Sequence, residues 1–299
     1  MTDNSLDFQC LDSSEQVAAA ATERLLDSAA RAIAEHGRFQ LVLAGGRTPL
    51  AVYRRLADQP ADWARWHLFF GDERCLPADD PERNSLTVRE VWLDRVPIPP
   101  DNIHPIRAEL GAEPAAAHYA ESIRDRLPFD LVLLGLGEDG HTASLFPGHP
   151  IQDEALVIPV RDAPKPPPER VSLTPLALGS SRAILILVTG RGKREALARW
   201  RAGADLPVSR IVTSGRLEVL MDAEAAGGCC HAVKAYPNVQ ACAVWPGSDS
   251  NTAHQAGCAA IRSSAWANSV RPGSILNQVE APDGCGSGMT SASQPSGER

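Results

Sequence analysis

Several features that mark other classes of protein are scarce in this chain of 299 residues. It has no uncharged apolar run of about 20 residues, the length that a helix needs to cross a bilayer. It has no excess of Lys and Arg either, since the formal net charge is −8. Phosphate backbones are bound through clustered cations, so the sequence predicts neither a membrane partner nor a nucleic-acid partner.

The first 20 residues lack the features of a secretion signal. They contain Asp3, Asp7, Asp12 and Glu15, and they have neither a basic segment nor an apolar core. The expected location is therefore cytoplasmic.

Cysteine is scarce in the larger part of the chain, because only Cys10 and Cys75 precede residue 229. That small number argues against a main domain built on disulfides. Five further cysteines and two histidines follow, but they lack the CxxC or closely spaced His pairs of a zinc site. We therefore expect no metal site in that segment.

Short apolar runs alternate with segments of helical periodicity through about residue 220. The runs, which suit strands covered on both faces of a parallel sheet, are 39–44, 67–70, 131–135, 183–188 and 210–213. The expected helices are 14–35, 49–57, 85–93, 114–126 and 193–201. This alternation predicts an α/β fold, a doubly wound and mostly parallel Rossmann-like sheet with helices on both faces. Ligands of such sheets bind at the carboxyl ends of the strands.

The composition changes near residue 227. Beyond it, Gly, Ser, Ala, Asn and Pro are frequent and the alternation of strands and helices is lost. We expect a single α/β domain over residues 1–226 and a low-complexity, disordered tail over residues 227–299.

A Gly-Gly turn follows the first central run. Gly45 and Gly46 precede Arg47 and Thr48, and a proline then begins a helix. This arrangement aims backbone N–H groups at an anion, while Arg47 adds a charge and Thr48 a hydroxyl. The alternative is an ordinary turn that needs glycine only for its unusual φ angles. The segment is a candidate phosphate site.

Three charged residues follow the next strand. Asp72, Glu73 and Arg74 lie where a ligand is expected, and Arg74 can hold a phosphate through two parallel hydrogen bonds. The alternative is a solvated loop with an internal Asp–Arg pair. Asp72 and Arg74 are candidate binding residues.

The most informative segment follows the run 131–135. A Gly-x-Gly-x-Asp-Gly frame brings the backbone close to a small ligand and leads through Gly140 into His141. His141 suits proton transfer near neutral pH, and Asp139 can orient its ring or raise its basicity. A capping or buried structural histidine is the alternative. The glycine frame favours catalysis.

Two further cations follow later in the chain. Lys193 opens a helix, where a positive charge opposes the helix dipole, so it is expected to bind an anion rather than to stabilise the helix. A solvated surface lysine is the alternative. Arg170 is expected near the same edge of the sheet.

Taken in order, these segments resemble the 6-phosphogluconolactonase family, whose fold is shared with glucosamine-6-phosphate deaminases. The resemblance covers about residues 8–225 and is carried by LAGGRTPLAVY, FFGDERCLP with RNS at 83–85, DLVLLGLGEDGHTASLFPG, RVSLTP and TGRGK. His141 is followed by TASLFP rather than the IAFNEP type of the deaminases, and the strand-end triplet is DER rather than DEY. Both features favour the lactonases. Arg47 departs from the family pattern, which often has Ser there.

The resemblance implies hydrolysis of 6-phosphoglucono-δ-lactone to 6-phosphogluconate, a step of the oxidative pentose phosphate pathway. It implies that residues 45–48, Arg74 and Lys193 hold the phosphate and that His141, with Asp139, activates water without a metal or any other cofactor. Asp72, Gly140 and Arg170 are further expected binding residues. The expected partner is a small phosphorylated sugar lactone, bound by a monomer or small homo-oligomer. Two alternatives stay open: a deaminase-like isomerase and a non-catalytic sugar-phosphate-binding regulator.

Overall fold

A seven-stranded parallel sheet forms the centre of the computed structural model, which describes residues 6–151 and 154–228. Its strands are β1 (Asp7–Leu11), β2 (Phe39–Leu43), β3 (Trp66–Phe70), β5 (Ile103–His104), β6 (Leu131–Gly135), β9 (Ala183–Val188) and β10 (Arg216–Asp222). The order across the sheet is β1-β10-β9-β6-β2-β3-β5, with every neighbouring pair parallel. The predicted α/β class and mostly parallel sheet are confirmed.

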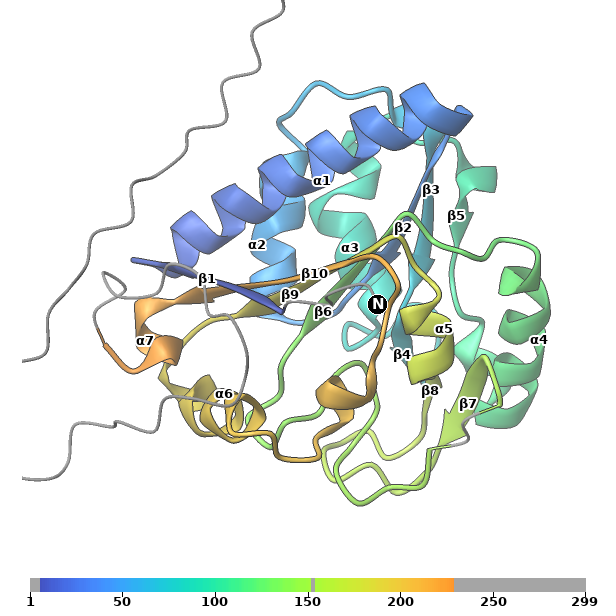
Figure 1. Ribbon diagram of the computed structural model, residues 1–299. Coiled ribbons are helices and arrows are strands. Elements are labelled where there is room, and N and C mark those ends of the chain that lie inside the picture. Colours follow the sequence, from blue (N-terminus) through green and yellow to red (C-terminus); the bar gives the residue numbers. More distant parts are fainter. Residues whose placement is uncertain (1–5, 152–153, 229–299) are drawn as a thin grey trace, which may run out of the picture. The chain divides into compact units, whose positions relative to one another are not determined.

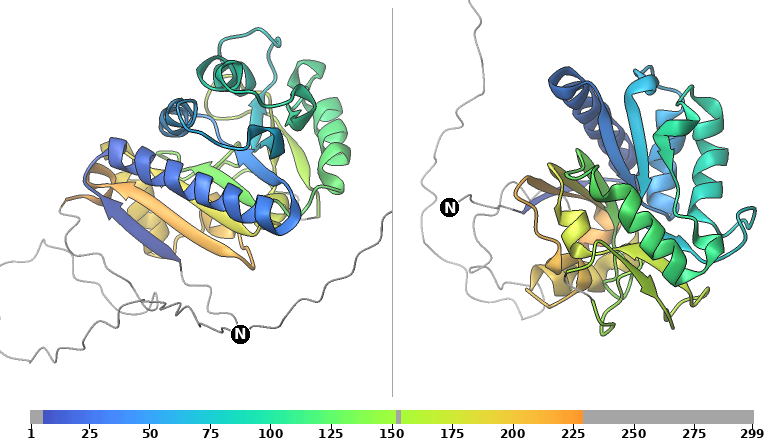
Figure 2. Two further views of the ribbon diagram at one scale, coloured as in Figure 1. Left: turned by 90° about the horizontal axis from the view of Figure 1, so that it is seen from above. Right: turned by 90° about the vertical axis from the view of Figure 1, so that its right-hand side faces the viewer.

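Helices cover both faces of this sheet (Figure 1). On one face lie α1 (Ser14–His36), α2 (Arg47–Leu56) and α3 (Asn84–Val91), and α1 runs along β1 and β10 (Figure 2). On the other lie α5 (Pro175–Gly179) and α6 (Arg194–Arg201), while α7 (Ala223–Ala226) follows β10. Every residue of β2 is buried, as expected of a strand covered on both faces. The five predicted helices end within two residues of the predicted positions.

A second, smaller sheet was not predicted. It contains β4 (Asp72–Arg74), β8 (Arg170–Leu173) and β7 (Val157–Val160), which are antiparallel, and α4 (Ala112–Arg124) packs against β7 and β8. The charged residues 72–74, expected only to follow a strand, themselves form β4. Strands of three or four residues are too short to show a periodic pattern in the sequence.

The predicted strand 210–213 was also wrong. A short 3₁₀ helix, Pro207–Arg210, occupies the start of this segment, and the strand of the sheet is β10. A proline that opens the 3₁₀ helix fixes its φ angle and has no N–H for a sheet ladder. The strand β1 was missed because it lies at the sheet edge, where only partly buried residues give no continuous apolar run.

The remaining short helices are 3₁₀ turns between the main elements. They are Trp63–Arg65, Leu93–Arg95, Pro100–Asn102, Ala108–Leu110 and Arg191–Lys193. Within residues 6–151 and 154–228, no helix combines the length and the hydropathy that a membrane span requires. The expected tail and its cysteines lie, from residue 229 onward, outside the described residues, so the division into residues 1–226 and 227–299 stays a prediction.

Candidate active site

A cleft of about 790 Å³ opens at the carboxyl ends of the parallel strands. The ends of β2, β6, β9 and β10 and the small strand β4 all contribute to its wall. The structure brings nine of the predicted site residues into this wall: Gly45, Gly46, Arg47, Thr48, Asp72, Arg74, His141, Arg170 and Lys193. Asp139 and Gly140 lie next to His141 in the chain but are not part of the wall. The position of the cleft agrees with the rule for open α/β sheets.

The Gly-Gly turn is held tightly between β2 and α2. Tyr53 of α2 donates its hydroxyl to the carbonyl of Ala44 at 2.9 Å and accepts the N–H of Ala44 at 3.0 Å. A Cβ atom at Gly45 would lie 2.2 Å from Asn84 Oδ1, and Gly46 has a φ of +100°. Both positions therefore need glycine, and α2 starts without a side-chain cap. The N–H groups of its first turn remain available to an anion.

A second turn, after β9, lies beside the first. The hydroxyl groups of Thr48 and Thr189 are 2.6 Å apart. Gly190 donates its N–H to both carboxylate oxygens of Asp222, at 3.0 and 2.9 Å, so the end of β10 fixes this turn. Asp222 was not predicted as a site residue, because its contact joins segments that are remote in sequence.

Lys193 lies at the end of the 3₁₀ turn Arg191–Lys193, just before α6. Burial lowers the pKa of Lys193 from its ordinary value, while the charge of Glu138 opposes this shift. A half-buried ammonium group gains most from a partner of opposite charge, so its position favours an anionic ligand.

His141 and Asp139 form a close pair in the loop after β6. Nδ1 of His141 lies 2.5 Å from Oδ1 of Asp139, and the same oxygen accepts the backbone N–H of His141 at 3.2 Å. The hydrogen on Nδ1 therefore points to Asp139, which leaves the lone pair on Nε2. This is the tautomer that a general base for water requires.

Burial and the ion pair act in opposite directions on this histidine. Burial lowers the pKa of His141, while Asp139 raises it, and the net effect is a lowered pKa. Burial alone would raise the pKa of Asp139, but the charge and hydrogen bonds of His141 leave it lowered. Near neutral pH the imidazole is therefore neutral and the carboxylate ionised, so His141 can accept a proton.

Gly137 makes the position of the ring possible. A Cβ atom at Gly137 would lie 2.0 Å from Nδ1 of His141, so any side chain there would displace the ring. Gly140 has a φ of +95°, and a Cβ atom there would lie 2.9 Å from Leu206. Two glycines of the predicted frame are thus required by close approach and by backbone conformation.

A further part of the cleft wall comes from the small antiparallel sheet, in which Arg74 of β4 and Arg170 of β8 are register partners. Arg170 donates to three backbone carbonyls, and its guanidinium lies 5.5 Å from the centre of the Phe146 ring. Arg74 donates to the carbonyl of Glu82. The side chains are thus preorganised on one wall. Asn84, which also lines the cleft, was not predicted as a site residue.

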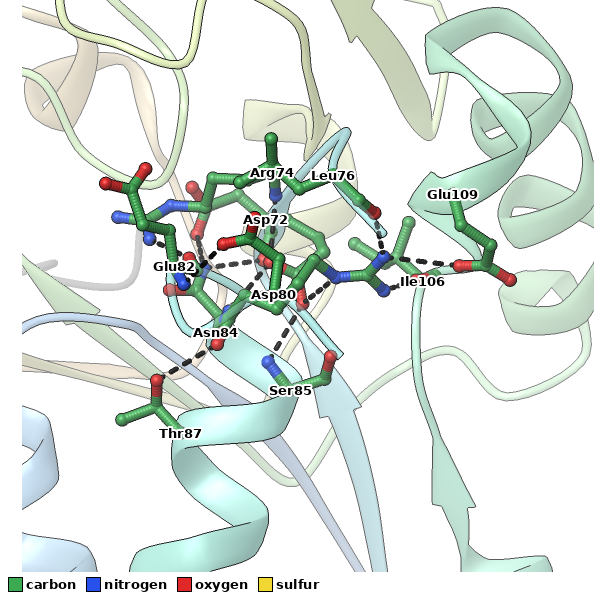
Figure 3. A network of polar contacts seen from close by, with 12 residues as sticks. Asp72, Arg74, Leu76, Asp80, Glu82, Asn84, Ser85, Thr87, Ile106 and Glu109 are labelled. Carbon is green, nitrogen blue, oxygen red and sulfur yellow. Dashed lines mark hydrogen bonds and ion pairs between the residues drawn. The ribbon is translucent and has the colours of Figure 1, made fainter. Parts of the chain in front are cut away.

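Glu73, which lies between the two predicted binding residues Asp72 and Arg74, holds the following loop in place. It is fully buried, accepts the N–H groups of Asn84 and Ser85 at 2.8 Å each, and pairs with Arg83 at 3.2 Å. Figure 3 shows this network, in which the guanidinium of Arg83 also reaches Leu76, Ile106 and Glu109. The ion pair of this loop is therefore Glu73 with Arg83, not the Asp–Arg pair of the alternative.

A parallel α/β sheet with a cleft at its strand ends, lined by cations and by a histidine that a neighbouring carboxylate orients, is typical of an α/β enzyme. The sequence profile of "Glucosamine-6-phosphate isomerases/6-phosphogluconolactonase" matches residues 12–221. The chain belongs to this family.

Named relatives are found in both sequence and structure. A 6-phosphogluconolactonase of Mycobacterium tuberculosis is 40% identical over 212 residues, which are 66% of this chain and 85% of that protein. The crystal structure of 6-phosphogluconolactonase from Thermotoga maritima superposes with a TM-score of 0.69 at 32% identity, over 73% of this chain and all of that one. A monomeric glucosamine-6-phosphate deaminase shares the fold, with a TM-score of 0.66 at 22% identity over 74% of this chain and 99% of the other.

Proposed function

We propose that this chain hydrolyses 6-phosphoglucono-δ-lactone to 6-phosphogluconate. The observation that carries the proposal is that His141, whose Nδ1 lies 2.5 Å from Oδ1 of Asp139, lines a cleft whose wall also contains a glycine turn and several cations. The pair supplies a base, and the turn and cations suit a phosphate. The names of relatives that are 40% identical support the same reaction.

The phosphate binds at the turn of residues 45–48, with Lys193 on the neighbouring turn and Arg74 on β4. The N–H groups at the start of α2 donate to its oxygens, and Lys193 neutralises its charge. This end of the substrate does not react. Its binding energy fixes the lactone carbonyl relative to His141, which converts affinity into orientation.

Nε2 of His141 removes a proton from a water molecule, and the oxygen of that water attacks C1 of the lactone. The tetrahedral intermediate collapses as the bond between C1 and the ring oxygen breaks. The imidazolium returns its proton to the ring oxygen, which becomes a hydroxyl, and the carboxylic acid product loses its proton to water. Asp139 stabilises the imidazolium between these steps. A positioned base contributes roughly 10² to 10⁴ in rate.

A deaminase-like isomerase is the closest rival. In the deaminase type of segment the residue before the proline is Glu, whereas this chain has Phe146 there, and Phe146 is buried with its ring 5.0 Å from that of His141. A phenyl group cannot transfer a proton, so the segment favours hydrolysis over isomerisation. The non-catalytic regulator is disfavoured by the neutral, carboxylate-oriented imidazole, which ligand binding alone does not require.

The test is acid release from freshly generated 6-phosphoglucono-δ-lactone, measured against spontaneous hydrolysis. The non-phosphorylated lactone is the control for the phosphate site, and ammonia release from glucosamine 6-phosphate measures the rival reaction. We expect acceleration that is much stronger for the phosphorylated lactone and no ammonia. Ammonia release would favour the isomerase, and no acceleration with either lactone would favour the regulator.

A further inference from the structure

Ser144 and Asp72 make a buried contact that the mechanism above does not use. The hydroxyl of Ser144 donates to Oδ2 of Asp72 at 2.6 Å, and the two residues are 1% and 7% exposed. The contact joins the loop after β6 to the strand β4, so it links the segment that carries the base to the part of the cleft wall formed by the small sheet.

The other oxygen of Asp72 is held less firmly. Oδ1 is 3.4 Å from Nδ2 of Asn84, a long contact that leaves lone pairs for a stronger donor. Asp72 lines the cleft, and its charge reaches His141, whose pKa it raises against the dominant effect of burial. The carboxylate and the imidazole therefore face the same space.

Ser144 itself is firmly placed. Its N–H donates to the hydroxyl of Ser172 at 3.2 Å, and Thr142 and Leu145 exchange backbone hydrogen bonds at 3.3 and 2.9 Å. Between them Ala143 has a φ of +47°, a conformation that costs free energy in a residue other than glycine. A tightly bonded, strained turn thus carries His141 at one end and Ser144 three residues later.

We propose that Ser144 is a positioning residue that orients Asp72 to accept a hydrogen bond from the substrate hydroxyl on the carbon next to the lactone carbonyl. The inference rests on the proposed function, in which water activated by His141 attacks C1 of the lactone. The hydroxyl nearest to that carbon is the one on C2. One oxygen of the Asp72 carboxylate accepts from Ser144, and the other accepts the hydrogen bond from this substrate hydroxyl. The pair Ser144 and Asp72 thereby selects 2-hydroxy lactones.

The test compares 6-phosphoglucono-δ-lactone with its 2-deoxy analogue in the wild type, Asp72→Asn and Ser144→Ala. A hydrogen bond to a charged group corresponds to roughly 10- to 100-fold in rate, so we expect the wild type to prefer the 2-hydroxy substrate in kcat/KM by about that factor. Both variants lose most of this preference, because the substitution lowers kcat/KM for the 2-hydroxy substrate and leaves that for the 2-deoxy analogue unchanged. The inference is overturned if the substitutions lower kcat/KM equally for both substrates, or if the wild type shows no preference between them.

Ser181→Ala is the matched control, since Ser181 is also buried and its hydroxyl donates to the carbonyl of Leu178 at 2.9 Å. It should lower the thermal midpoint and leave the substrate preference unchanged. If Ser144→Ala does not fold, Ser144→Cys retains the shape with a weaker donor and gives the same comparison. A wild type that hydrolyses neither substrate contradicts the proposed function as well, whereas turnover with equal costs contradicts the inference alone.

Discussion

The loop after β6 and the sheet edge at β3 and β5 each contain a histidine whose pKa is lowered by burial. At the sheet edge, burial lowers the pKa of His104 to about 4, and the charges of Arg126 and His67 act in the same direction. The ring stacks on Phe69, with 4.5 Å between ring centres. Among the described residues, its buried Nε2 atom has no hydrogen-bond partner.

In the loop after β6, the pKa of His141 is also lowered, but the surroundings of the ring differ. Asp139 accepts from Nδ1 of His141, and the ring lines a cleft. Burial makes both imidazoles neutral near pH 7, so a neutral histidine is not in itself a catalytic feature. What distinguishes His141 is a carboxylate that fixes its tautomer and a cavity that admits a substrate.

The largest effect is expected from Gly137→Ala, which breaks the geometry of His141 without touching its chemistry. The added methyl group would overlap the ring, so the base is displaced and kcat should fall by about 10² to 10⁴, as for removal of the base itself. Steady-state kinetics with the phosphorylated lactone measure the loss. Gly135→Ala is the control, because a Cβ atom there meets nothing within 4 Å; a similar loss in that variant would contradict the role of the close approach.

A smaller effect is expected from Asp139→Asn, which removes the charge that distinguishes His141 from His104. A hydrogen bond to a charged group is worth about 1.5 to 3 kcal/mol, so kcat should fall roughly 10- to 100-fold. Because Asp139 raises the pKa of His141, the acid limb of the profile of kcat/KM against pH should move to lower pH in the variant. In the wild type that limb should lie below pH 6.5. An acid limb that moved upward would show that Asp139 does not stabilise the imidazolium.

The smallest effect on turnover is expected from His104→Phe, which keeps an aromatic ring against Phe69. In the wild type, the unfolded chain binds a proton at His104 below about pH 6.5, whereas the folded chain does so only near pH 4. The contribution to the free energy of unfolding is therefore complete above pH 6.5 and is lost as the pH falls towards 4. Urea unfolding at several pH values should show a shallower acid decline in the variant, with unchanged kcat. An equally steep decline would remove His104 as its cause.

The sequence predicts the parts of this structure that are determined by local pattern. The buried strands β2, β6 and β9 were found because both faces are covered and nearly all of their residues are apolar, Gln40 of β2 being the polar exception. The cleft residues were found because glycines and charges follow these strands directly. Helix ends were close for the same reason, since periodicity stops where the helix stops.

Contacts between remote segments were not predictable. Ser144 reaches Asp72 across 72 residues, and Asp222 fixes a turn 32 residues earlier; no local pattern marks either pairing. The small sheet also depends on such a contact, because its strands are short and β4 pairs with the remote β8, with Asp72 opposite Ser172. Glu73 is one of three charged residues that the sequence places at the ligand edge, but its role is to hold the loop. Its partners Arg83, Asn84 and Ser85 all come from the segment that follows β4.

The difference in role between His141 and His104 is tested most directly by the steady-state kinetics of His141→Gln on freshly generated 6-phosphoglucono-δ-lactone, measured beside His104→Phe and the wild type. Loss of the base should lower kcat by about 10² to 10⁴ in the first variant, with little change in KM, because the phosphate site is intact. The second should match the wild type. An unchanged kcat in His141→Gln would contradict the assignment of His141 as the general base.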